Sequence, residues 1–144
     1  MGDPMTVKLA ESDAERRACF PVMRQLRAHL GDEDVFLERV ARQGTQGYRL
    51  AFVADDGAVR AVAGFRVGET LFAGKWLYVD DLVTDEAARS KGYGKALLDF
   101  LKAHAREQGC RELHLDSGVQ RREAHAFYFR EGLRISSYHF QLEL

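Results

Sequence analysis

The stretch Arg89–Leu98, "RSKGYGKALL", constrains the fold more than any other part of this sequence. It places Gly92 and Gly94 at the end of a loop that follows a strand-like segment and leads into a helix-like one. A strand, a glycine-rich loop and a helix in that order bring unpaired backbone N–H groups and the positive end of a helix dipole together. Because glycine lets a ligand approach the backbone closely, the stretch predicts an anion site, and phosphate is the anion that suits it best.

Two familiar phosphate-binding patterns do not match this loop. A P-loop requires G-x-x-x-x-G-K-[ST], but Arg89 occupies the position of the first glycine and Ala96 follows Lys95. The dinucleotide fingerprint requires a third glycine where this chain has Leu97. The pattern that remains is [R/Q]-x-x-G-x-[G/A], which the chain meets from Arg89 onward. On this hexamer alone, a glycine-rich turn that caps a surface helix stays an equal alternative.

The other segments alternate between strand-like and helix-like patterns. The sequence "DDG", residues 55–57, joins two β-rich runs and predicts a hairpin. Pro21 interrupts the first helical run, where we expect a break or a kink. The predicted order is β-αα-βββ-α-β-α-β(β), so we expect an α/β (α+β) fold with a mixed, mostly antiparallel sheet flanked by helices. Strands are predicted at 6–10, 48–55, 58–68, 75–84, 111–117 and 134–144, and helices at 11–30, 32–43, 94–108 and 122–131.

Size and composition limit the class of protein. With 144 residues, 46% of them hydrophobic, the chain 1–144 is expected to form a single domain with its own core. A formal net charge of −1 argues against a nucleic-acid binder, which usually carries a basic excess. Cys19 and Cys110 match no metal spacing and are expected to be free thiols in a reducing compartment. No secretory signal or long apolar run is present, so we expect a soluble cytoplasmic protein without membrane contact.

The order of motifs in the second half of the chain resembles the GCN5-related N-acetyltransferase (GNAT) superfamily. The resemblance covers essentially the whole chain and is strongest from Trp76 to Leu133. It rests on the loop from Arg89 to Gly94 and on an A-x-x-F-Y-x-x-x-G segment that begins at Ala124. It implies a GNAT-like fold and acetyl-coenzyme A (acetyl-CoA) as co-substrate. The pyrophosphate would then bind to the backbone N–H groups of Arg89, Ser90, Lys91, Gly92, Tyr93, Gly94 and Lys95.

The resemblance also assigns roles to two other segments. Leu82, Val83 and Thr84 match the strand that pairs with the pantetheine arm, and one of their N–H groups would polarise the thioester carbonyl. Tyr128 matches the family tyrosine that protonates the departing thiolate, a step that suits a phenol with a pKa near 10. A core aromatic role for Tyr128 is the alternative.

The general base departs from the family pattern. Many relatives place a Glu where this chain has Tyr78. Asp80 shares a face with Tyr78 in a regular strand, while Asp81 points the other way, and a nearby bulge would shift either one. We expect Asp80 first and Asp81 second as base or amine anchor, and a salt-bridged structural carboxylate is the alternative for each.

The run "SGVQRREAHAFY" resembles a small-amine branch of the family that includes aminoalkylphosphonate acetyltransferases. In that resemblance His125 contacts coenzyme A or positions Tyr128, and a surface histidine is the alternative. His114 and Asp116 would present two ligands on one strand face, but no third ligand is spaced to complete a site, so no metal is expected.

Three functions remain open at this stage. The first is acetyl transfer to a primary amine of a small molecule, by direct attack in a ternary complex. The second is the same reaction on a protein or peptide amine, and the third is a catalytically weak acyl-CoA-binding module, suggested by Tyr78. The acidic run at 31–36, "GDEDVF", either attracts a cationic amine or forms a solvated helix start. The alternating segment 138–144 could offer a strand edge to a second copy, giving a homodimer.

Overall fold

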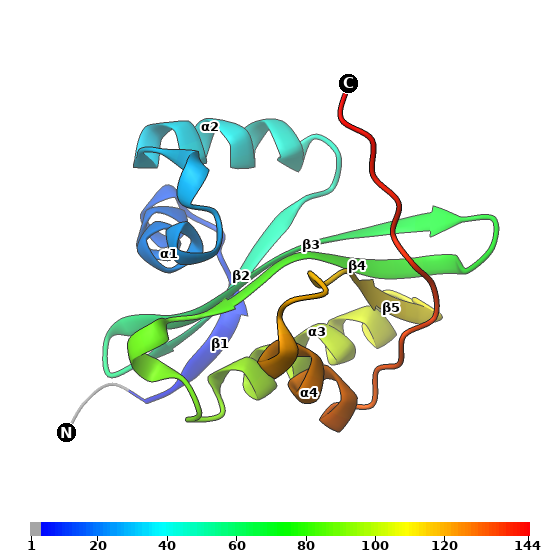
Figure 1. Cartoon of the computed structure of the whole chain (residues 1–144). Helices are drawn as coiled ribbons and strands as arrows, with labels where there is room; N and C mark the ends of the chain where they lie inside the picture. Colours follow the sequence, from blue (N-terminus) through cyan, green and yellow to red (C-terminus); the bar gives the residue numbers. More distant parts are fainter. Residues whose placement is uncertain (1–3) are drawn as a thin grey trace. The chain divides into compact units, whose positions relative to one another are not determined.

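A computed structural model describes residues 4–144, which form two compact units, one ending at His114 and the other comprising Leu115–Leu144. The prediction of a single domain over 1–144 stays a prediction. Figure 1 shows the elements in chain order. They are β1 (Thr6–Leu9), α1 (Asp13–Leu26), the 3₁₀ turn η1 (Ala28–Leu30), α2 (Glu33–Gly44), β2 (Arg49–Asp55), β3 (Ala58–Thr70), β4 (Gly74–Thr84), the 3₁₀ turn η2 (Glu86–Ala88), α3 (Tyr93–Glu107), β5 (Glu112–Leu115) and α4 (Arg122–Arg130).

The five strands form one sheet in the order β1-β2-β3-β4-β5, and the first three neighbouring pairs are antiparallel. The β2–β3 turn has Asp56 at φ 53° and Gly57 at φ 75°. Positive φ at both central residues is the geometry that matches the twist of a tight hairpin. The predicted α/β fold with a mostly antiparallel sheet, and the hairpin at 55–57, are therefore confirmed.

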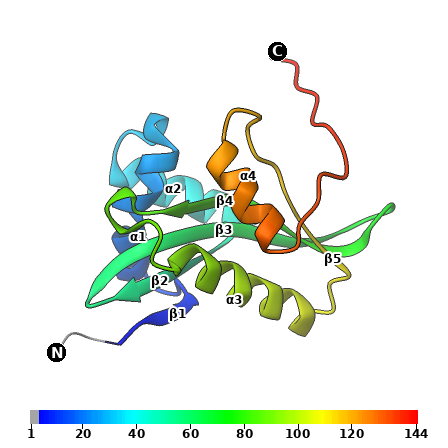
Figure 2. The same cartoon turned by 60° about the horizontal axis from the view of Figure 1, so that its bottom comes forward.

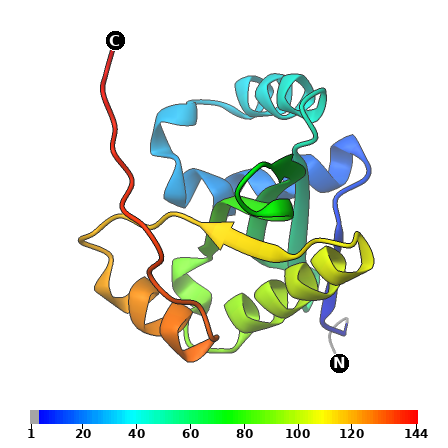
Figure 3. The same ribbon diagram turned by 90° about the vertical axis from the view of Figure 1, so that its right-hand side faces the viewer.

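Helices cover both faces of the sheet. Figures 1 and 2 show α1 and α2 on one face and α3 on the other, and Figure 3 shows the same layers from the side. Under α1 and α2 lies a cluster of buried side chains that includes Phe20, Met23 and Phe36. On α3, Leu97, Leu98, Leu101 and Ala105 are buried, so one stripe of this amphipathic helix faces the core.

The predicted break at Pro21 is wrong, because α1 runs continuously from Asp13 to Leu26, while a kink there stays a prediction. Ser12 caps its first turn by accepting from the Glu15 N–H at 3.1 Å, and the Glu15 carboxylate accepts from the Ser12 N–H at 3.2 Å. Pro21 is exposed, while Phe20, Val22 and Met23 on either side of it are buried. The capping box and the buried face outweigh the one helix hydrogen bond that proline cannot donate.

The contact between β3 and β4 contains a bulge. Gly64 is opposite Asp81 and Phe65 is opposite Val79, so Asp80 has no partner on β3. In a regular strand Asp80 and Asp81 would point to opposite faces. The extra residue changes this alternation, and both aspartates line one cavity beside α2. The bulge therefore creates the candidate site.

The predicted closing strands at 134–144 are wrong. In the part of the chain that the structure describes, no helix or strand follows α4, and apolar side chains such as Phe140 and Leu142 are exposed. Alternation permits a strand, but a strand forms only where its backbone finds a hydrogen-bonding partner. The end of α4 agrees with prediction, since Gly132 has φ 92° and donates to the Phe129 carbonyl at 3.2 Å.

Candidate active site

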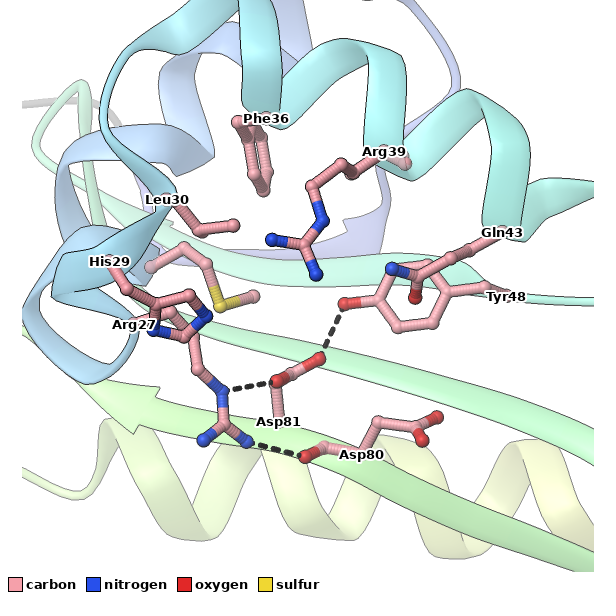
Figure 4. A pocket seen from close by; sticks show the side chains of 11 residues that line it. Arg27, His29, Leu30, Phe36, Arg39, Gln43, Tyr48, Asp80 and Asp81 are labelled. Carbon is pink, nitrogen blue, oxygen red and sulfur yellow. Dashed lines mark hydrogen bonds and ion pairs between the residues drawn. The ribbon is translucent and has the colours of Figure 1, made fainter. Parts of the chain in front are cut away.

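Asp81 is the centre of the candidate site. Its Oδ2 accepts a hydrogen bond of 2.6 Å from the Tyr48 hydroxyl, and its Oδ1 accepts one of 2.8 Å from Arg27 Nε. Arg27 comes from the end of α1, Tyr48 directly precedes β2, and Asp81 belongs to the bulge of β4 (Figure 4). The Asp81 side chain is only 14% exposed. Three segments that are distant in sequence therefore fix the orientation of one carboxylate.

Gly64 makes room for this pair. A Cβ at this position would lie 1.8 Å from the Tyr48 hydroxyl oxygen and 2.7 Å from Asp81 Oδ2. Any side chain here would displace one of the two partners. A glycine inside a strand often marks such a close approach, so Gly64 is the sequence signal that could have located Tyr48 and Asp81.

Tyr48 is a hydrogen-bond donor that stays protonated. Burial raises the pKa of Tyr48 well above its ordinary value of 10, and the negative charge of Asp81 raises it further. The Tyr48 phenol is therefore protonated at neutral pH and donates its hydrogen bond to Asp81. Sequence reasoning missed Tyr48, because nothing in the linear pattern connects this residue to β4.

The carboxylate of Asp80 has a different hydrogen-bond partner from those of Asp81. Its carboxylate makes two hydrogen bonds with Arg66, of 2.9 Å from Nε and 2.8 Å from Nη2. The backbone carbonyl of Asp80 accepts from Arg27 Nη2 at 3.0 Å. The Arg66 guanidinium also lies 5.4 Å from the centre of the Tyr78 ring, so the residue at the usual Glu position takes part in a cation–π contact.

A cavity of about 330 Å³ opens between α2, the α1–α2 connection and the bulge of β4. Its apolar walls include Leu30 and Phe36, and its polar lining includes Arg39 and Gln43 besides the two aspartates. Figure 4 shows Arg39 pointing from α2 into the space above Asp81. A concave space of this volume with a few directed polar groups is typical of small-molecule sites.

The acidic run at the start of α2 does not supply free negative charge to this cavity. Asp32 accepts from the Val35 N–H at 2.9 Å and caps the helix. Glu33 and Asp34 lie 2.7 and 3.5 Å from Arg17 Nη1. Of the two interpretations from the sequence, the structure therefore favours the helix start over the attraction of a cationic amine.

The loop before α3 has the backbone geometry of an anion site. Ser90 has φ 64° and Gly92 has φ 85°, and no side chain caps the helix. Within residues 4–144, the backbone N–H groups of Gly92, Tyr93 and Gly94 at the start of α3 have no hydrogen-bond partner. Arg89, Ser90 and Lys91 are exposed, and nothing lies within 4 Å of a Cβ built on Gly92. Consecutive free amides at a helix start, with open space in front of them, fit a pyrophosphate.

Two residues of this loop direct their side chains to neighbouring parts of the first unit. The Tyr93 hydroxyl donates a hydrogen bond of 2.6 Å to Asp55 Oδ2, and this bond, together with burial, raises the pKa of Tyr93. The contact fixes the start of α3 to the end of β2. Lys95 Nζ lies 3.3 Å from Asp99 Oδ2. Tyr93 therefore has only its backbone N–H to offer a ligand.

The end of β4 has one free edge. Leu82, Val83 and Thr84 are opposite Ala63, Val62 and Ala61 of β3. On the other side β5 begins beside the start of β4, where the Arg111 N–H donates to the Lys75 carbonyl at 2.7 Å. Because β5 has only four residues, it is too short to reach residues 82–84. In the described sheet, this edge of β4 therefore lacks a strand partner.

The second unit contains the other two candidate residues. Tyr128 is a buried residue of α4, and burial raises its pKa, while the nearby charge of Arg121 lowers it in part. His125 Nε2 lies 2.8 Å from the Gly118 carbonyl oxygen, so this side chain connects α4 to the loop before it.

No group of three His, Cys, Asp or Glu side chains in the described chain is placed to bind a metal ion. His114 lies 2.6 Å from Glu112 Oε1, and its ring centre is 4.5 Å from that of Trp76. Its contacts are those of a strand residue packed against an aromatic neighbour. None of the helices in residues 4–144 has the length and apolar character to cross a membrane.

A family model described as Acetyltransferase (GNAT) family matches residues 13–132. The chain therefore belongs to the GNAT acetyltransferase family and is an N-acetyltransferase. It is 37% identical over 137 residues to an uncharacterised N-acetyltransferase, YhdJ of Bacillus subtilis, covering 94% of this chain and 96% of that protein. It is 31% identical over 94 residues to the aminoalkylphosphonate N-acetyltransferase of Salmonella typhimurium, covering 65% of this chain and 60% of that protein.

Solved structures agree on the fold. The aminoglycoside N-acetyltransferase AAC(6')-Iy in complex with CoA matches with a TM-score of 0.83 at 14% identity, covering 100% of this chain and 97% of that one. The GNAT fold binds acetyl-CoA, and the predicted resemblance to this family is confirmed.

Proposed function

We propose that this N-acetyltransferase transfers the acetyl group of acetyl-CoA to the primary amine of a small molecule. The observation that carries the proposal is the cavity of about 330 Å³ around Asp81, whose volume suits a small molecule. The 31% identical relative, by its name, acts on an aminoalkylphosphonate, which is also a small amine.

Asp81 is the proposed amine anchor and proton acceptor. An ammonium group must lose a proton before its nitrogen lone pair can attack the acetyl carbon. Asp81 points into the cavity and has lone pairs beyond those used by Tyr48 and Arg27. Asp80, the first choice from sequence, is the weaker candidate because Arg66 occupies both of its carboxylate oxygens.

The acetyl-CoA contacts are proposed from the backbone geometry. The N–H groups of the loop from Arg89 to Lys95 would bind the pyrophosphate, and the exposed Arg89 and Lys91 would add charge. The free edge of residues 82–84 would pair with the pantetheine arm, so that the acetyl thioester reaches the cavity. Tyr128 is the proposed general acid for the thiolate, since a phenol with a raised pKa is fully protonated at neutral pH. His125 stays a proposed contact of coenzyme A.

The acetyl group is proposed to pass directly to the amine without an enzyme thioester. Both cysteines are free thiols, and burial raises the pKa of Cys19 to about 12 and also raises that of Cys110. A protonated thiol is a poor nucleophile, so neither side chain is suited to accept the acetyl group. Two free thiols also support our proposal of a cytoplasmic location.

A thiol-release assay over a panel of amines tests the proposed function. Purified protein and acetyl-CoA are incubated with small primary amines and, separately, with peptides that offer a lysine or a free N-terminus. We expect acetylation of at least one small amine and none of the peptides. Acetylation of peptides alone would favour the protein acceptor, and coenzyme A binding without any transfer would favour a weak acyl-CoA-binding module.

We also propose that the C-terminal segment pairs with a second copy of the chain. Its apolar side chains alternate and are exposed, as in Tyr138, Phe140 and Leu142. An alternating apolar segment without a partner strand is suited to pairing between copies. Light scattering of the full chain should give a dimer, and Phe140→Asp should shift it to monomer. A monomeric wild-type protein would contradict this.

A further inference from the structure

Arg39 is a cation without a counter-ion inside the cavity. It lies in the middle of α2, is half-buried, and points its guanidinium toward the space over Asp81 (Figure 4). In the described part of the chain it has no ion pair and no hydrogen bond. The apolar side chains of Leu30 and Phe36 line the same cavity. A guanidinium beside such walls gains more from an anionic partner than one in open water.

The carboxylates of the cavity are already matched. Arg27 donates to Asp81 at 2.8 Å, and Arg66 binds Asp80 through two hydrogen bonds. Each aspartate therefore has its own guanidinium, and the charge of Arg39 is left over. An incoming molecule that carried only positive charge would face this surplus cation, which disfavours it.

We infer that the acceptor is an amine that also carries an oxyanion group, a carboxylate or a phosphonate, and that Arg39 binds this group. The inference rests on the proposed function and names the substrate class of the same site. Gln43 lies one helical turn after Arg39, lines the same cavity and offers amide N–H groups beside the guanidinium. A planar guanidinium suits the two oxygens of such a group, while the amine lies toward Asp81.

Binding of amine-free probes tests the anion site without catalysis. Propanoate and propylphosphonate are titrated into the full chain with coenzyme A present, and the two probes distinguish a carboxylate from a phosphonate. We expect at least one to bind, and Arg39→Gln to weaken it by about 10- to 100-fold, as for a lost hydrogen bond to a charged group. Arg42→Gln on the exposed side of α2 is the matched control and should bind as the wild type does. No binding to the wild type, or equal binding to Arg39→Gln, would overturn the inference.

Kinetics with matched amines separates this inference from the proposed function. The substrates are 3-aminopropanoate, 3-aminopropylphosphonate and the uncharged 3-aminopropanamide. We expect the wild type to prefer an acid, and Arg39→Gln to raise KM for the acids by about 10-fold or more but to affect the amide far less. A wild type that prefers the amide would refute the anion site while small-amine transfer stands. If none of the small amines is acetylated, the proposed function fails, and the binding experiment alone decides the anion site.

Discussion

The Tyr48 hydroxyl donates a hydrogen bond of 2.6 Å to Asp81 Oδ2, and this pair lies against the bare Cα of a glycine. Tyr48 and Asp81 are 33 positions apart in sequence, and the bulge in β4 brings them together. A buried phenol that must stay protonated therefore fixes one oxygen of the carboxylate to which we assign the acceptor amine.

Gly64→Ala should break this pair. Its Cβ would lie 1.8 Å from the Tyr48 hydroxyl oxygen, so Tyr48 or Asp81 must move. We expect the free energy of unfolding to fall by about 1–3 kcal/mol, as for overpacking of a core. We also expect most of the acetyl-transfer activity to be lost. Gly68→Ala is the matched control, because its Cβ would meet Trp76 at an ordinary 3.7 Å. Denaturant unfolding and thiol release measure both effects, and equal behaviour of the two variants would refute the role of Gly64.

Gly92→Ala should weaken coenzyme A binding. Gly92 has φ 85°, which costs an L-residue about 1–2 kcal/mol, and its position needs open space for the ligand. We expect the Kd for coenzyme A, measured by calorimetry, to rise by about 10-fold, equivalent to 1.4 kcal/mol. Gly44→Ala, at the end of α2 with nothing near its Cβ, should leave the Kd at its wild-type value. A wild-type Kd in Gly92→Ala would argue against the loop as pyrophosphate site.

Tyr128→Phe should slow turnover but spare coenzyme A binding. Loss of a general acid costs about 10²- to 10⁴-fold in kcat. Tyr138→Phe, which removes the same hydroxyl from an exposed side chain of the second unit, should keep wild-type kcat. If both variants turn over at the wild-type rate, Tyr128 is a core aromatic and not the acid.

The free energy of unfolding should decrease as the pH is lowered, and protonation of Glu15 should account for part of this decrease. Its hydrogen bond with Lys8 and those from the Glu11 and Ser12 N–H groups lower the pKa of Glu15 to about 2, from an ordinary 4.5. Because the folded-state pKa is the lower one, the stabilisation is fully present above pH 4.5 and is lost as the pH falls toward 2. Glu15→Gln retains a capping group without the charge. In thermal unfolding experiments, we expect the variant to be less stable than the wild type at pH 7 and equally stable near pH 2. A constant difference across this range would contradict the assignment.

The sequence was sufficient to predict the main elements of the fold. Asp56 and Gly57 dictate their turn because few other residues tolerate positive φ, and the four-residue spacing of Leu97, Leu101 and Ala105 identifies the buried face of α3. Local rules failed where the deciding contacts are distant in sequence. Pro21 is tolerated because of packing around it, and 134–144 lacks the partner that a strand needs.

The candidate site was only half predictable. The aspartates and the glycine loop could be found because their residue types and order are themselves the signal. Arg27, Arg39 and Tyr48 reach the cavity only through the packing of α1 and α2 over β4, which no linear pattern encodes. The bulge at Asp80 was foreseen as an influence, but its register could not be, since it depends on which β3 residue opposes Asp81.

The assignment of the acceptor site to Asp81 is tested most directly by comparing kcat/KM of Asp81→Asn with kcat/KM of Asp80→Asn. Both variants retain an oxygen for the neighbouring arginine, and coenzyme A binding by calorimetry serves as the test of folding. For an amine that the wild type acetylates, we predict that Asp81→Asn lowers kcat/KM by about 100-fold or more, the effect of losing a general base, while Asp80→Asn loses far less. Wild-type kcat/KM in Asp81→Asn, with coenzyme A binding intact, would contradict the acceptor site described here.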